Sequence, residues 1–112
     1  MKYKLTDETI KHNDKTLYRI QALKDFGNVK AGDLGGWIQS ETSLSQNGDC
    51  WVYDEARIFG NARVFGNAKV FDNVWVYDNA RISDNAQVFG NAQVNGDADI
   101  YGDTKIKDGF IT

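Results

Sequence analysis

The chain contains one histidine, His12, and one cysteine, Cys50, and these side chains are the first to consider for catalysis. A histidine serves as a general base and a thiol as a nucleophile when neighbouring groups orient them and adjust their pKa values. His12 lies beside Asn13 and Asp14, outside the regular part of the sequence, and Cys50 holds a position that small apolar residues fill elsewhere. We therefore expect a surface or cap histidine and a buried cysteine, and we predict no catalytic residue.

The acidic residues and the glycine-rich segment 32–36 do not form the patterns that metal ions or phosphates require. Asp72, Asp78 and Asp84 recur every six residues, which places them on three different corners of the coil described below. Asp54 and Asp72 share a corner, but one stacked pair is more typical of a turn than of a calcium site. Segment 32–36 lacks the Lys-Ser/Thr pair and the following helix of a P-loop. We expect neither a metal nor a cofactor.

Length and composition indicate one folded domain. The 112 residues are 41% apolar and 26% charged, which is the balance of a globular protein. A single cysteine excludes a disulfide framework within the chain. Segment 1–6 lacks the apolar stretch of a signal peptide, and no apolar run is long enough to span a bilayer. We expect a cytoplasmic protein with no membrane partner.

The net charge of −3 is unevenly distributed. Residues 1–30 carry seven Lys and Arg against four Asp and Glu, whereas residues 31–112 carry six against twelve. An acidic body lacks the positive surface that nucleic acids require, so the sequence disfavours nucleic-acid binding. It leaves open an acidic nucleic-acid mimic, which would occupy a basic cleft of another protein.

A six-residue repeat dominates the sequence, and we count eleven hexads without insertion between Leu44 and Gly109. Each hexad has four residues in which small or branched side chains alternate with large or charged ones. A corner pair such as Gly-Asn or Asp-Asn follows, and these residues tolerate positive φ. Because every hexad has the same phase, a hairpin meander is excluded. The repeat predicts a coil of three short strands and eighteen residues, on which the next coil stacks in parallel.

The predicted interior has a branched column and a column of small residues, with Val74 as an enlarged member of the second. Phe110 takes the next small position, and we expect it to close the open end of the coil. The branched column is Val52, Ile58, Val64, Val70, Val76, Ile82, Val88, Val94, Ile100 and Ile106. The small column is Cys50, Ala56, Ala62, Ala68, Val74, Ala80, Ala86, Ala92, Ala98 and Thr104.

The segments Val64–Ala68 and Val88–Ala92 resemble the motif of the hexapeptide-repeat family. This resemblance implies an all-β fold, a left-handed parallel β-helix with the outline of a triangular prism, over residues 44–112. Residues 1–43 lack the hexad, and we expect them to form an N-terminal cap with a β-hairpin and an irregular first coil. The hairpin is predicted from the strand patterns at 9–12 and 16–20, which flank a turn.

The resemblance also bears on function, because many hexapeptide-repeat enzymes are acyltransferases. They use a histidine as general base, together with a protruding loop and clefts between neighbouring prisms. His12 matches no motif position of that family, and the uninterrupted hexads leave no protruding loop. We therefore predict that the chain is not an enzyme. The opening segment and the aromatic-Gly-Asn-Ala motif resemble those of small uncharacterised hexapeptide-repeat proteins of phages and prophages.

Nine of the fourteen aromatic residues point outward in this register, and sorting by eighteen residues distributes them over three faces. Large exposed apolar patches enriched in aromatic residues are typical of protein interfaces. The first face carries Trp51, Tyr53, Phe71 and Phe89; the second carries Arg57, Phe59, Trp75 and Tyr77; the third carries Arg63, Phe65, Arg81, Ser83, Asp99 and Tyr101. The candidate partner-binding residues are Trp51, Tyr53, Phe71, Phe89, Trp75 and Tyr77.

The sequence therefore predicts a non-catalytic binding module that presents aromatic faces to a protein partner or to its own copies, as a dimer or trimer. The similarity to phage proteins implies a phage-encoded inhibitor of a host defence protein as one form of this role. An acyltransferase-like enzyme is the alternative, beside the nucleic-acid mimic.

Overall fold

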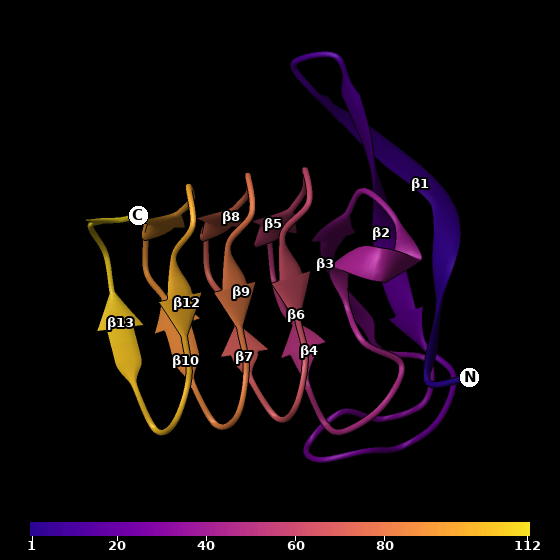
Figure 1. Ribbon diagram of the computed structural model, residues 1–112. Helices are drawn as coiled ribbons and strands as arrows, with labels where there is room; N and C mark the ends of the chain where they lie inside the picture. The colour runs from indigo at the N-terminus through magenta and orange to yellow at the C-terminus, as the bar shows by residue number, and fades with distance from the viewer.

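The computed structural model describes residues 1–112 as a β-solenoid whose N-terminal end is covered by a hairpin (Figure 1). The solenoid has three faces. The covered face is formed by β3 (Leu34–Ile38), β5 (Arg57–Ile58), β8 (Trp75–Val76), β11 (Gln93–Val94) and β14 (Phe110–Ile111). The ladder face is formed by β4 (Trp51–Val52), β7 (Lys69–Val70), β10 (Gln87–Phe89) and β13 (Lys105–Lys107). The open face is formed by β6 (Arg63–Val64), β9 (Arg81–Ile82) and β12 (Asp99–Ile100).

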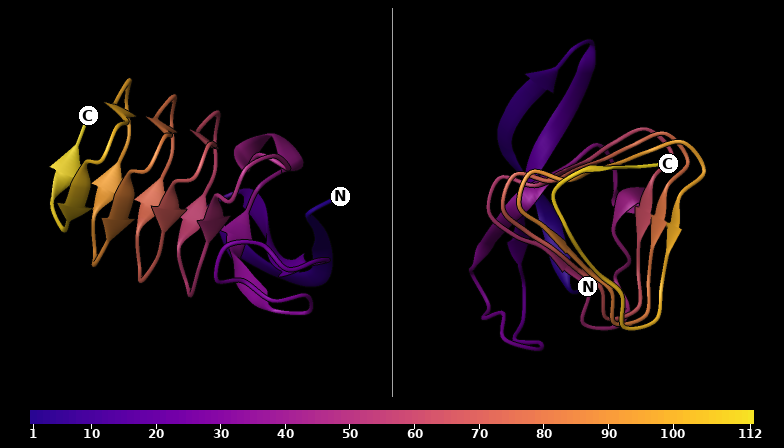
Figure 2. Two further views of the ribbon diagram at one scale, coloured as in Figure 1. Left: turned by 90° about the horizontal axis from the view of Figure 1, so that it is seen from below. Right: turned by 90° about the vertical axis from the view of Figure 1, so that its left-hand side faces the viewer.

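Consecutive coils stack in parallel with an eighteen-residue offset. On the ladder face Val52 pairs with Val70, Val70 with Val88, and Val88 with Ile106. Figure 2 shows the triangular outline; viewed from the C-terminal end, the chain runs clockwise as it approaches the viewer, which is a left-handed coil. The predicted left-handed parallel β-helix is confirmed.

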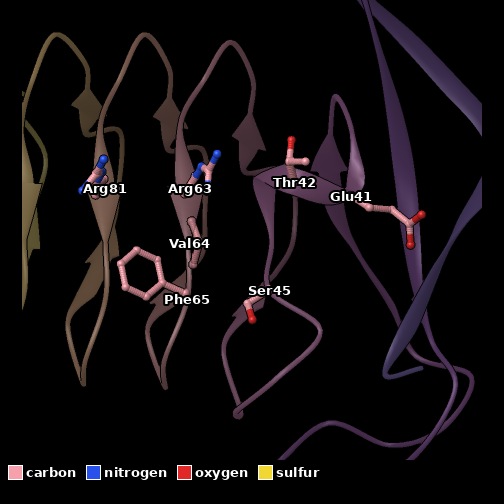
Figure 3. A pocket seen from close by; sticks show the side chains of 7 residues that line it. All are labelled: Glu41, Thr42, Ser45, Arg63, Val64, Phe65 and Arg81. Atoms are coloured by element: carbon pink, nitrogen blue, oxygen red, sulfur yellow. The ribbon is translucent and has the colours of Figure 1, made fainter.

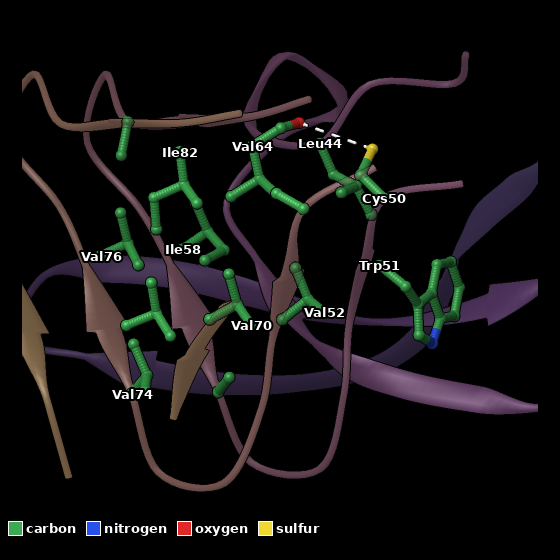
Figure 4. Packing of buried hydrophobic residues seen from close by; sticks show 14 of the residues in the cluster. Leu44, Cys50, Trp51, Val52, Ile58, Val64, Val70, Val74, Val76 and Ile82 are labelled. Atoms are coloured by element: carbon green, nitrogen blue, oxygen red, sulfur yellow. Dashed lines mark hydrogen bonds between the residues drawn. The ribbon is translucent and has the colours of Figure 1, made fainter. Parts of the chain in front are cut away.

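The two predicted columns form the core of the prism (Figure 4). The branched residues from Val52 to Ile100 and the small residues from Cys50 to Ala98 are all buried. Only the last coil differs: Ile106 is half-buried and Thr104 is exposed. Small and branched side chains alternate across the narrow interior, which lets the three strands of each coil approach closely.

Aspartates at the corners connect one coil to the next. Asp54, Asp72, Asp78 and Asp84 adopt positive φ of 57–63°. The Gly90 amide donates to Asp72 Oδ2 at 2.9 Å, and the same contact recurs with the Asp54, Asp78 and Asp84 carboxylates. Because these carboxylates accept backbone hydrogen bonds one coil away, their six-residue recurrence has a structural cause.

The N-terminal hairpin continues the sheet of the covered face. Strands β1 (Tyr3–His12) and β2 (Lys15–Ala22) flank a turn at Asn13, where φ is 57°. Strand β2 pairs antiparallel with β3, and β3 pairs parallel with β5. Between β3 and β4 lies a single turn of 3-10 helix, η1 (Glu41–Ser43). No helix of this structure has the length and apolar character needed to cross a membrane.

The register departs from the predicted repeat at both ends. Leu44 bridges Val64 in the branched column, twenty residues away, because the corner that follows it is longer than a regular one. At the other end Phe110 pairs with Gln93, an offset of seventeen residues. The shorter Asp108-Gly109 corner turns Phe110 outward, where it is 76% exposed, so the prediction that it closes the end of the prism is wrong. Ile111 packs against the core in its place.

Ile82→Asp should unfold the solenoid, because the new carboxylate would lie without a partner in a fully buried column. Burying an unpaired charge costs several kcal/mol, a large part of the roughly 5–15 kcal/mol that stabilises a domain. Thermal unfolding followed by circular dichroism measures the loss. Gln87→Asp, at an outward position of β10, is the control and should melt close to the parent; a parental curve for Ile82→Asp would contradict the inward assignment.

Candidate functional site

The ladder face presents three aromatic rings from successive coils, Tyr53, Phe71 and Phe89, here called the aromatic ladder. The Phe71 and Phe89 rings stack in parallel with centroids 5.0 Å apart, and Tyr53 meets Phe71 edge-on at 6.3 Å. All three side chains are half-buried. The Tyr53 hydroxyl donates to Asn28 Oδ1 at 2.9 Å, and burial raises the pKa of this phenol. The sequence placed these rings on one outward face, and the structure brings them together there.

Trp51 does not belong to an exposed surface, contrary to the prediction. Its side chain is 1% exposed and meets Tyr3 and Phe26 edge-on, with centroids 6.0 and 5.3 Å away. A Cβ at Gly35 would lie 2.7 Å from the indole, so this glycine permits the close approach. Trp51 does point away from the prism interior, but residues 1–35 fold over this end of the face. The indole is therefore an internal contact and is not available to a partner.

The covered face is also less exposed than predicted, because the hairpin packs against outward residues of its first two coils. Leu17, Trp37 and Phe59 form a second buried cluster, in which Phe59 is 6% exposed. Trp75 and Tyr77 pack against this cluster and are half-buried. The predicted end cap over the first 43 residues did not include this lateral packing. Only the alternation of apolar residues along the hairpin could have indicated it.

His12 is held in this covered cluster. Its ring centroid lies 4.3 Å from that of Phe59 and 4.5 Å from that of Trp75. Arg57 Nη1 lies 3.0 Å from His12 Nδ1. A guanidinium only donates hydrogen bonds, so Nδ1 is the acceptor and the proton is assigned to Nε2. Burial lowers the pKa of His12, as do the Arg57 charge and the nearby Lys15. The imidazole is neutral at pH 7, and the Nδ1 lone pair is engaged by Arg57.

The open face contains a cavity lined by polar and apolar side chains (Figure 3). Its volume is about 460 Å³, and Phe65 contributes an apolar wall that is 39% exposed. Arg63, Phe65 and Arg81 lie on this face as predicted, but they were not among the predicted site residues. The only available signal was the eighteen-residue spacing of the two arginines. The cavity is lined by Glu41, Thr42, Ser45, Arg63, Val64, Phe65 and Arg81.

Cys50 and the carboxylates do not form a reactive or metal-binding centre. Burial raises the pKa of the Cys50 thiol, which disfavours the nucleophilic thiolate. No group of three or more His, Cys, Asp or Glu side chains is arranged to hold a metal ion.

Two comparisons with known proteins identify relatives of the repeat. A family model described as the YdcK beta solenoid repeat matches residues 56–70. A curated protein of Escherichia coli (strain K12), named uncharacterized acetyltransferase YdcK, is 52% identical over 42 residues. This match covers 38% of the chain and 13% of the relative, so the chain corresponds to a small part of that protein. The prediction that the chain is not an enzyme is contradicted, because the matched relative is named an acetyltransferase.

Packing of the hairpin on the covered face should weaken as the pH falls. The pKa of His12 in the folded chain is lowered from its ordinary value near 6.5, so the unfolded chain takes up the proton first. The contribution of neutral His12 is complete above pH 6.5 and is lost as the pH falls below it. Melting temperatures between pH 5 and 8 measure this slope. In His12→Gln the slope over this range should flatten, and an unchanged slope would contradict the assignment.

Proposed function

We propose that the chain is a rigid β-solenoid scaffold whose aromatic ladder binds a second copy of the chain. The main support is the ladder itself. Tyr53, Phe71 and Phe89 remain half-exposed on a face that the N-terminal residues cover only at its beginning. Aromatic side chains bury large areas in interfaces and lose little side-chain entropy, because few torsions must be fixed.

The charges around the aromatic ladder suit a two-fold interface between identical copies. Such an interface brings the same patch of both subunits together, so the patch must complement itself. The ladder face carries Lys69 and Lys105 in the column beside the rings, and Asp54 and Asp72 occupy the adjoining corner. A patch that holds both signs of charge beside an apolar centre can pair with its own copy, whereas a patch of one sign would repel it.

The double variant Tyr53→Ser with Phe71→Ser should remain folded and lose self-association. Interface anchors cost about 2 kcal/mol or more each in binding, so the loss of two should raise the dimer dissociation constant by about a thousandfold. The ring pairs also stabilise the monomer by about 0.5–1 kcal/mol each, which allows a modest fall in melting temperature. Sedimentation velocity over a concentration series measures association.

Tyr101→Ser is the matched control, because Tyr101 is 61% exposed and lies on the open face. This variant should associate like the parent. If the double variant also associates like the parent, the aromatic ladder only stabilises neighbouring strands. If the parent is a monomer throughout the series, the proposed second copy is wrong.

Acetyl transfer is the second candidate function, and the match to a protein named as an acetyltransferase favours it. The two candidates are compatible, because paired prisms would create a cleft that one prism lacks. His12 is the only imidazole in the chain. Its Nδ1 would have to leave Arg57 before it could accept a proton from a substrate.

Acetyl-CoA with a panel of amino sugars tests this candidate through release of the CoA thiol. We expect turnover above the uncatalysed rate, with a decrease of about 10²-fold or more in His12→Gln if this imidazole is the general base. Equal rates in both proteins would place the chemistry elsewhere on the chain. Absence of turnover across the panel would remove acetyl transfer as a candidate.

A further inference from the structure

Two arginines on the open face are stacked directly on one another without an internal partner. Arg63 pairs with Arg81 in the parallel register of β6 and β9, and both side chains are exposed. Neighbouring strands lie about 4.8 Å apart, and like charges directly opposite one another are unfavourable. The remaining arginines are fixed: Arg19 binds Gly35 and Glu55, and Arg57 binds His12. No side-chain hydrogen bond or ion pair engages Arg63 or Arg81, so their guanidinium donors are free.

The surroundings of this pair supply further donors and an apolar wall. Thr42 on η1 and Ser45 after it bring hydroxyl groups to the cavity of about 460 Å³, and Phe65 and Val64 form its apolar side (Figure 3). A second hollow of about 330 Å³ shares Thr42 and both arginines and adds the side chains of Asn61 and Asn79. The two guanidinium groups therefore lie between two hollows with polar linings.

The nearby carboxylates form no ion pair with either guanidinium group. Glu41 lines the larger cavity, but Figure 3 shows its carboxylate directed away from both arginines. Glu41 Oε1 instead accepts a hydrogen bond of 3.2 Å from Gln46 Nε2. Asp99 follows Arg81 in the same outward column but forms no ion pair with it. Two positive charges thus remain together on a body whose net charge is negative.

We propose that Arg63 and Arg81 bind the phosphate group of a phosphate monoester, whose organic part lies against Phe65. A guanidinium presents a planar set of donors that matches phosphate oxygens in a bidentate manner. A phosphate monoester carries close to two negative charges at pH 7, which balances both arginines, whereas one carboxylate balances a single arginine. The Thr42 hydroxyl, which lines both hollows beside the pair, can bind a remaining phosphate oxygen. This inference does not depend on the aromatic ladder, which lies on another face.

Isothermal titration with inorganic phosphate and with adenosine monophosphate (AMP), at low ionic strength, tests the site. We expect saturable one-to-one binding of both probes, with AMP bound at least threefold more tightly because its ring contacts Phe65. Arg63→Ala and Arg81→Ala should each weaken AMP binding by tenfold or more, as the loss of a charged hydrogen bond predicts. Phe65→Ser should reduce AMP binding to the level of inorganic phosphate.

Lys105→Ala is the matched control, because it removes one positive charge from an exposed position on the ladder face. It should bind both probes like the parent. Equal weakening in Lys105→Ala and Arg81→Ala would show a nonspecific charge effect and overturn the site. Absence of saturable binding of either probe would also overturn it, and equal affinity for AMP and inorganic phosphate would contradict the role of Phe65. Circular dichroism of each variant confirms that the solenoid is intact.

Discussion

The eighteen-residue hydrogen-bonded register between coils is the constraint on which the rest of the structure depends. The Arg57 amide donates to the Val74 carbonyl, and the Arg81 amide donates to the Ala98 carbonyl, both at 2.9 Å. A strand of two residues contributes little alone, so its position is fixed by the coils on either side. Because side chains alternate along a strand, a slip of one residue would turn the branched column outward. The same register stacks Phe71 on Phe89 and Arg63 on Arg81.

The first coil has no coil before it, so other residues must cover its core. The N-terminal residues meet this need with polar as well as apolar contacts. Lys2 is 1% exposed and donates to the Cys50 carbonyl at 2.8 Å, while the Tyr3 hydroxyl donates to the Leu44 carbonyl at 2.6 Å. Burial lowers the pKa of Lys2, which reflects the cost of keeping an ammonium group there. These contacts satisfy carbonyls that a further coil would otherwise have bound.

The repeat was sufficient to predict the interior and the faces but not what covers them. The alternation of side chains and the constant phase of the hexads predicted the inward columns, because the direction of each of these side chains depends only on its own hexad. Trp51 and Phe59 point away from the prism as predicted, yet segments remote in sequence bury both. Phe110 was misplaced because the corner before it is one residue shorter. The eighteen-residue spacing of Arg63 and Arg81 was visible in the sequence. That no acidic side chain pairs with them could be seen only in the structure, because it depends on where η1 and the neighbouring coils place their side chains.

The three faces of the prism are unevenly covered. The hairpin covers the first two coils of the covered face, the N-terminal residues conceal the start of the ladder face, and the open face keeps both arginines and Phe65 accessible. The match to the YdcK repeat at residues 56–70 includes outward residues such as Phe59 and Phe65 as well as inward and corner positions. Because the inward columns are buried in the prism, a ligand or a second protein can meet only outward side chains, and those of the ladder and open faces are the least covered.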